Sequence, residues 1–294
     1  MSAQDNSIRP VLAATLGIAL FAAMDAVMKG GALVIGAYSA FLLRCLMGSL
    51  LLAPIWWWRR RVFPRGRVLR IHLVRGTVIA FMGWSFFASL VYLPPAEAIA
   101  ISFVAPLIAL YLARLLLGEV IRPRAVAGTI LGLVGVIVIV AGRIGRERLD
   151  GDAAFGIALV LVSAVLFAWN LILQRQQALV SSPLEASTFQ NGTVTLVLGV
   201  GAPFLLVLPD RETVMLLGLA AMLAILAAML FIWAYARSET QRLVPIEYTG
   251  FLWASLFGWL FFAEPIRPLT VAGAVLIVIG CWIATRRRTE QTAL

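Results

Sequence analysis

A ten-residue sequence occurs twice in this chain, and nearly half of the chain's length separates the two copies. The first copy reads Glu-Val-Ile-Arg-Pro-Arg-Ala-Val-Ala-Gly over residues 119–128, and the second reads Glu-Pro-Ile-Arg-Pro-Leu-Thr-Val-Ala-Gly over residues 264–273. Seven of the ten positions are identical, and each copy separates two strongly apolar segments. The 145-residue offset indicates duplication of a whole structural unit, because solenoid repeats are only about 20–50 residues long.

Composition points to a lipid environment for the duplicated unit. Apolar residues make up 62% of the chain and charged residues 13%, whereas soluble domains average about 45–50% and about 25%. The net charge of +10 could suggest nucleic acid binding. The arginines, however, lie between apolar runs, as they do in the cytoplasmic loops of membrane proteins. We therefore predict an all-α integral membrane protein with the lipid bilayer as its surroundings and no nucleic acid partner.

Ten apolar segments are long enough to cross a bilayer, which takes roughly 20 residues per helix. Their connections are short, and several contain glycine or proline, including Gly30-Gly31 between the first two segments. This pattern predicts ten transmembrane helices, five in each half. The predicted segments are 11–29, 36–58, 71–92, 95–117, 124–142, 153–173, 187–207, 213–236, 242–263 and 267–285.

The distribution of positive charge predicts the orientation of these helices. Sixteen basic residues fall on the side of the N-terminus, from Arg9 to the group at 286–288, and six fall on the opposite side. The positive-inside rule then places both termini in the cytoplasm. Because each half has an odd number of spans, residues 11–142 and 153–285 are predicted to form two inverted five-helix repeats.

The sequence also argues against several sources of energy and chemistry. A nucleotide-binding Walker A loop needs a lysine beside serine or threonine, and Lys29, the only lysine, follows methionine and precedes glycine. No ATPase activity, cofactor or ATPase partner is expected. Cys45 and Cys281 fall inside apolar segments, so neither a disulfide framework nor a metal site is predicted.

The arrangement resembles the drug/metabolite transporter superfamily, specifically its ten-span branch with two EamA-type halves. The resemblance covers residues 11–285, with Gly118-Glu119 and Ala263-Glu264 closing the fourth and ninth spans, and with Arg-Pro and a glycine-rich span after each pair. Arg44, Pro106 and Trp169-Asn170 also match. The resemblance implies export of small metabolites, amino acids or drugs across the plasma (bacterial inner) membrane through a central cavity. Aromatic amino-acid exporters are the most similar group.

Charged side chains inside apolar spans are costly, about 2.5–3.5 kcal/mol each at mid-helix on insertion scales, so each one indicates function. Asp25 and Arg44 both lie in such spans. They are predicted either to bind substrate or a coupling proton, or to pair with each other and lock the first two spans. Glu119 and Glu264 belong to opposite faces and are predicted to cap the Ile-Arg-Pro turns that follow them.

Prolines indicate where the central cavity lies. Pro106 in the fourth span and Pro245 in the ninth each remove a backbone hydrogen bond and are expected to kink their helices. Such kinks would allow spans one to four and six to nine to rock against each other, with spans five and ten as a rigid spine. The predicted substrate-binding residues are Trp84, Ser102, Phe103, Pro106, Trp169, Asn170, Glu247 and Tyr248.

These features predict a secondary exporter of small amphipathic metabolites, with aromatic and other neutral amino acids first. A multidrug or lipophilic-cation exporter, a lipid-linked sugar flippase and a metabolite importer are the alternatives on the same fold. A membrane-embedded enzyme is disfavoured, and no catalytic residues are predicted: the single histidine, His72, lies at a basic membrane edge, and carboxylates do not recur at helical spacing within a span. The sequence leaves the oligomeric state open, and a monomer is compatible with it.

Overall fold

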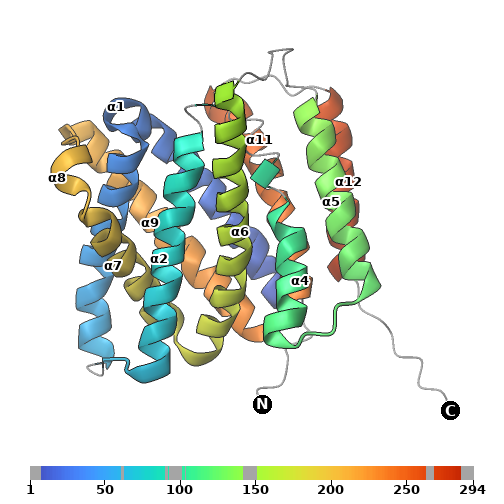
Figure 1. The fold of residues 1–294 in the computed structure, drawn as a ribbon, viewed down its shortest axis with the longest axis horizontal. Coiled ribbons are helices and arrows are strands. Elements are labelled where there is room, and N and C mark those ends of the chain that lie inside the picture. Colours follow the sequence, from blue (N-terminus) through green and yellow to red (C-terminus); the bar gives the residue numbers. More distant parts are fainter. Residues whose placement is uncertain are drawn as a thin grey trace.

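The computed structural model of the chain describes residues 8–60, 63–89, 92, 101–102, 104–141, 151–262 and 268–285. Every regular element in these ranges is a helix (Figure 1). The helices are α1 (Arg9–Arg60), α2 (Gly66–Ser89), α4 (Ala105–Leu117), α5 (Pro123–Ala141), α6 (Gly151–Val180), α7 (Pro183–Gly199), α8 (Ala202–Leu205), α9 (Arg211–Arg237), α10 (Thr240–Leu243), the 3₁₀ helix η1 (Val244–Tyr248), α11 (Thr249–Phe262) and α12 (Pro268–Thr285).

The first element, α1, is two helices joined by a sharp turn. Its 52 residues would extend about 78 Å as one straight helix, more than twice the hydrocarbon thickness of a bilayer. The turn lies at Gly36, whose φ of 77° and ψ of 156° are non-helical. The prediction of a turn at Gly30-Gly31 was therefore wrong, because the chain reverses where a glycine adopts positive φ and those two glycines remain helical.

Local sequence explains where several other helices begin and end. The Asp210 carboxylate accepts a hydrogen bond of 3.0 Å from the Thr213 amide at the start of α9, a favourable N-cap. Hydrogen bonds from Thr213 also hold the pKa of Asp210 below its ordinary value. Ser182 caps α7 in the same way, with proline following it. Gly118 ends α4 in the left-handed conformation, with φ of 67°.

The helices pack in pairs that repeat between the two halves of the chain. α2 packs along α6, α9 packs along α1, and α5 packs along α12. The pair of α5 and α12 lies at one end of the molecule in Figure 1, apart from α1, α2, α7 and α9. Helices of one half thus contact helices of the other along most of the molecule.

Glycines bring α5 and α12 close together. A Cβ added at Gly135 would lie 2.7 Å from the carbonyl oxygen of Gly273, and a Cβ added at Gly280 would lie 2.6 Å from the carbonyl oxygen of Gly128. Both distances are too short for a real Cβ contact, so only glycine fits at these two positions. The two contacts are reciprocal, because 128 and 273, like 135 and 280, are separated by the 145-residue offset of the sequence repeat.

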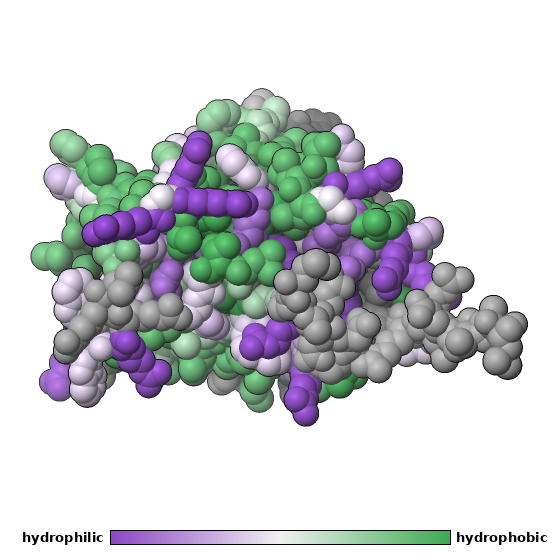
Figure 2. All heavy atoms as spheres, turned by 90° about the horizontal axis from the view of Figure 1, so that it is seen from below, coloured by the Kyte–Doolittle hydropathy of each residue, from purple (hydrophilic) through white to green (hydrophobic). Residues whose placement is uncertain are grey.

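The outer surface of the bundle is strongly apolar. Within the described parts of the chain, four helical segments are long and apolar enough to cross a membrane, namely Arg9–Ala32, Val34–Arg59, Ala154–Val180 and Arg211–Arg237. Large side chains such as Trp58 and Phe204 are 80% and 87% exposed, an arrangement that lipid tolerates and water does not. Seen from below the view of Figure 1, long hydrophilic side chains lie across this face of the molecule (Figure 2).

Candidate functional site

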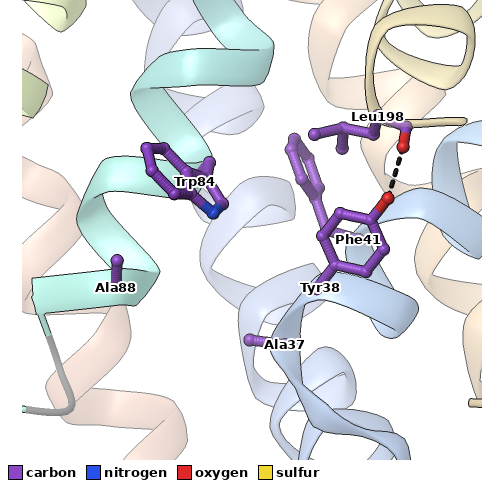
Figure 3. A pocket seen from close by; sticks show the side chains of 6 residues that line it. All are labelled: Ala37, Tyr38, Phe41, Trp84, Ala88 and Leu198. Atoms are coloured by element: carbon purple, nitrogen blue, oxygen red, sulfur yellow. Dashed lines mark hydrogen bonds between the residues drawn. The ribbon is translucent and has the colours of Figure 1, made fainter. Parts of the chain in front are cut away.

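A small hollow between α1, α2 and α7 is lined by aromatic rings. Its volume is about 190 Å³, and Ala37, Tyr38, Phe41, Trp84, Ala88 and Leu198 line it. Figure 3 shows Trp84 of α2 facing Phe41 and Tyr38 of α1, while the Tyr38 hydroxyl donates to the Leu198 carbonyl oxygen of α7. Trp84, predicted as a cavity wall, is therefore part of this hollow, and Tyr38 and Phe41 are wall residues that sequence reasoning missed.

Arg44 lies one turn beyond Phe41 on the same helix. Its side chain is buried at 8% exposure, and its guanidinium carbon lies 5.1 Å from the centre of the Phe41 ring. One terminal nitrogen donates to the Cys45 sulfur at 3.2 Å, and the Nε–H has no hydrogen-bond partner among the residues that the structure describes. Asp25, on the same element α1, is exposed. Arg44 thus has a buried donor available for an anionic group.

The predicted substrate-binding residues of the fourth and sixth spans differ in how deeply they are buried. Pro106 is buried in the first turn of α4, whose N-cap is Val104, and Ser102 is helical just before it. Phe103 lies outside the described residues. Trp169 is 40% exposed, whereas the neighbouring Asn170 is 6% exposed, because adjacent residues on a helix point about 100° apart.

The ninth span contains the two remaining predicted residues. Pro245 stands at the start of the 3₁₀ helix η1, so the local hydrogen bonding changes where the sequence predicted a kink. Glu247 is half-buried and accepts a hydrogen bond of 3.4 Å from Tyr235. Tyr248 is fully buried, and a Cβ at Gly132 of α5 would lie 2.5 Å from its ring. In this conformation Tyr248 packs against the α5 helix, apart from the hollow at Trp84.

A buried arginine is surrounded by amide oxygens between α2, α6 and α7. Arg75 of α2 is 3% exposed. Its Nε donates to Asn170 at 3.1 Å and one terminal nitrogen to Gln174 at 2.7 Å. The other terminal nitrogen donates to Gln177 at 2.6 Å and to Gln190 at 2.8 Å. These contacts, which we call the Arg75 network, join α2 to α6 and α7 through four neutral acceptors.

A histidine–glutamate pair adjoins the Arg75 network. The Nε2 of His72 lies 3.2 Å from Glu185 Oε1, and its Nδ1 lies 2.6 Å from Gln177 Nε2. His72 is completely buried and stacks on Phe189 with 4.7 Å between ring centres. His72 is therefore enclosed by α6 and α7, an environment that its place among basic residues in the sequence did not predict.

Glu119 caps a helix of the other half of the chain. Its two carboxylate oxygens accept hydrogen bonds from the backbone amides of Thr240 and Gln241, at 3.1 and 3.3 Å, in the first turn of α10. Arg175 of α6 lies 3.9 Å from the same carboxylate and donates to the Tyr235 carbonyl oxygen. The prediction that Glu119 caps its own Ile-Arg-Pro turn was wrong, because tertiary packing brings a helix N-terminus to it. Glu264 lies outside the described residues.

The sequence pattern of the EamA-like transporter family matches this chain twice, at residues 8–141 and 154–286. The chain belongs to this family. The resemblance to EamA-type transporters of the drug/metabolite transporter superfamily is thereby confirmed, and the protein is a membrane-embedded transporter of small molecules.

Several known proteins are similar to this EamA-like transporter over much of its length. The pseudopaline exporter CntI of Pseudomonas aeruginosa (strain UCBPP-PA14) is 26% identical over 282 residues, which are 95% of this chain and 96% of the exporter. A riboflavin transporter of Rhizobium johnstonii is 27% identical over 227 residues, 75% of this chain and 71% of that protein. The aromatic amino acid exporter YddG of Ancylobacter novellus is 30% identical over 101 residues, 34% of this chain and 35% of that exporter.

A solved crystal structure shares the fold of this EamA-like transporter. The two superpose with a TM-score of 0.77 over 94% of this chain and 96% of that chain, at 21% sequence identity. A likeness at this identity shows the fold alone.

One sequence signal could have revealed the Arg75 network of this transporter. Asn170, Gln174 and Gln177 recur at i, i+4 and i+7, the spacing of one helix face. The sixth span was predicted to end at residue 173, but α6 continues to Val180 because Arg75 satisfies these polar side chains inside the bundle.

Proposed function

We propose that this EamA-like transporter is a secondary exporter of small amphipathic metabolites, with aromatic and other neutral amino acids as its first substrates. The observation that carries the proposal is the position of Arg44. A buried guanidinium with an unpartnered Nε–H stands beside Phe41, which lines an aromatic hollow. A carboxylate on Arg44 and a ring in the hollow would satisfy both features with one amino acid.

The size and lining of the hollow favour a ring over a larger group. Its volume of about 190 Å³ is below the roughly 300–1,000 Å³ of pockets for drug-sized ligands, so it would enclose only the side chain of a substrate. Stacking against each of the rings of Tyr38, Phe41 and Trp84 adds about 0.5–1.5 kcal/mol beyond the area buried. Asp25 lies on the same element α1 as Arg44, and it is the group we assign to the substrate ammonium.

The proposed architecture is ten transmembrane helices in two inverted repeats, residues 11–142 and 153–285, in the inner membrane with both termini in the cytoplasm. The reciprocal glycine contacts of α5 and α12 support it, as do the equivalent pairings of α2 with α6 and of α9 with α1. An axis lying in the membrane plane relates two halves of opposite orientation. Cysteines introduced at Arg65 and at Arg211 should then react with impermeant reagents from opposite sides of the membrane, and labelling from one side would contradict this topology.

Transport would follow alternating access around this axis. The start of α4 at Pro106 and the 3₁₀ segment at Pro245 supply places where α4 and the ninth span can bend. Ser102, Phe103, Trp169, Asn170, Glu247 and Tyr248 remain proposed cavity residues for the conformations in which these helices have moved. The α5–α12 pair is the proposed rigid spine.

Counterflow in proteoliposomes tests the substrate class directly. Vesicles loaded with unlabelled L-phenylalanine should accumulate labelled L-phenylalanine and L-tryptophan, and the Arg44→Gln variant should lose this accumulation. Arg70→Gln, at an exposed arginine of α2, is the matched control and should behave as the wild type. Accumulation of neither amino acid by a correctly inserted wild type would overturn the substrate proposal.

Export of lipophilic cations is the second candidate, and one observation favours it. Glu247 is half-buried with Tyr235 as a hydrogen-bond donor, so a carboxylate is already placed inside the bundle. Tetraphenylphosphonium, a cation without a carboxylate, separates the two proposals in the same vesicles. Its transport without that of amino acids would favour Glu247 as the binding group, and Glu247→Gln should then abolish it.

A further inference from the structure

The hydrogen bonds around His72 form a chain, and Arg75 at one end of it determines which group donates in each bond. Arginine nitrogens only donate, so the Gln177 oxygen that lies 2.6 Å from Arg75 must accept. The amide nitrogen of Gln177 therefore faces His72 and donates to Nδ1 at 2.6 Å. With Nδ1 as an acceptor, the neutral imidazole carries its proton on Nε2 and donates it to Glu185 at 3.2 Å.

A proton added to this imidazole cannot be accommodated without a rearrangement. It would bind to Nδ1, where it would face the N–H of Gln177, so two donors would oppose each other. Rotating the Gln177 amide removes that conflict but turns its nitrogen toward Arg75, which also only donates. Protonation of His72 therefore removes an acceptor from Arg75, the residue that joins α2 to α6 and α7.

We propose that His72 and Glu185 form a proton-binding site that couples transport by this protein to the proton gradient. Proton uptake at His72 Nδ1 loosens the Arg75 network and lets α2 separate from α6 and α7. Proton release restores the Gln177 bridge and closes the helices again. The two charge states of one side chain thereby bias two arrangements of the helices, which is what coupling requires.

The surroundings of His72 suit this role. Among the described residues, the charged groups near it are Glu185 from α7 and Arg75 from one turn along α2. α6 contributes the neutral Gln177, and Phe189 of α7 stacks on the ring. Glu185 stabilises the imidazolium once it forms. His72 lies six residues, about 9 Å along the helix, from the start of α2 at Gly66, so a proton has a short path from the helix end.

The proposed proton site does not depend on the substrate proposal, because it requires only that the chain is a transporter. It also offers an unusually direct test, since His72 is the single histidine of the chain. Protein labelled with ¹⁵N in its imidazole rings gives the signals of this one side chain. At about pH 8 we expect Nε2 protonated and Nδ1 bare, and toward about pH 5 we expect Nδ1 to gain a proton. A ring protonated on Nδ1 at about pH 8, or one that stays neutral to about pH 5, would overturn the proposal.

Hydrogen exchange then tests whether the proton moves the helices. After correction for intrinsic rates, exchange in residues 66–80 of nanodisc-embedded protein should rise on acidification. It should not change with pH in His72→Gln, which keeps hydrogen-bonding groups but cannot titrate. Glu185→Gln is the second variant if His72→Gln fails to fold, and Arg70→Gln is the control that should respond like the wild type. An equal rise in His72→Gln would overturn the coupling.

Flux measurements complete the test with labelled L-phenylalanine as the probe. An imposed pH gradient should accelerate wild-type transport about fivefold or more, the lower range of common coupling factors. His72→Gln should move phenylalanine equally fast with and without the gradient, and stimulation that persists in this variant would refute the site. If the wild type moves no phenylalanine, the substrate proposal fails alone, because the imidazole titration and the exchange experiment decide the proton site without a substrate.

Discussion

Two buried arginines of this transporter differ in how many hydrogen-bond acceptors surround them. Arg75 donates to four amide oxygens from two other helices. Arg44 has a sulfur and an aromatic ring as neighbours, and its Nε–H is unpartnered. Burying a guanidinium without acceptors costs several kcal/mol. Arg75 has four acceptors, whereas the Nε–H of Arg44 has none among the described residues. We therefore assign them different roles, structural for Arg75 and ligand-binding for Arg44.

The largest expected effect is the loss of stability when Arg75 is removed. Arg75→Leu leaves buried amide oxygens without a donor, at about 1–3 kcal/mol for each one that no water reaches. We expect Tm in detergent to fall by roughly 10 °C, taking about 2–4 °C per kcal/mol. The Tm of Arg75→Lys should lie between those of the wild type and Arg75→Leu, since a lysine ammonium has three donors but lacks the planar arrangement of a guanidinium. Thermal unfolding followed by tryptophan fluorescence measures the Tm of both variants. An unchanged Tm in Arg75→Leu would contradict a structural role for Arg75.

Arg44 should give the opposite pattern, with an effect on binding and little on stability. Arg44→Gln removes a charged hydrogen bond to the substrate carboxylate, worth about 1.5–3 kcal/mol, which is about a 10- to 150-fold loss of affinity. The Tm of Arg44→Gln should remain within a few degrees of the wild type, because the proposed hydrogen-bond partner of Arg44 is the substrate carboxylate and not a group of the protein. Substrate affinity and Tm are measured on the same preparation. A large fall in Tm without a change in affinity would make Arg44 a structural residue like Arg75 and end the contrast.

The smallest effect is expected from the aromatic wall beside Arg44. Trp84→Ala removes one ring contact, so discrimination between phenylalanine and leucine should fall about 2- to 10-fold. Trp169→Ala is a matched comparison, because both side chains are about half exposed, at 51% and 40%, and only Trp84 lines the hollow. Competition of unlabelled amino acids against labelled phenylalanine gives the ratio. A greater loss in Trp169→Ala would move the aromatic wall to α6.

Sequence reasoning located Arg44 more reliably than Arg75, and the reason is position along the chain. Arg44 lies deep within an apolar run, so a buried charge could be inferred from its neighbours in sequence. Arg75 follows a series of arginines and lies near the start of the predicted span 71–92, so positive-inside counting grouped it with the cytoplasmic charges. Whether a basic residue near a helix end is solvated or buried depends on the helices packed beside it. Arg75 is covered by residues 170–190, which are about 100 positions away from it in the sequence.

The sequence by itself determined the family, the all-helical membrane architecture and the places where many helices begin and end. These follow from local properties, namely apolar runs matched to a bilayer, capping residues such as Asp210, and the duplicated ten-residue sequence. Only the tertiary structure decided that Glu119 caps α10, that Tyr248 packs on Gly132, and that His72 and Glu185 share a site. Each of these contacts joins residues more than 100 positions apart, and the free energy of burying a polar group is set by the partner it meets in space.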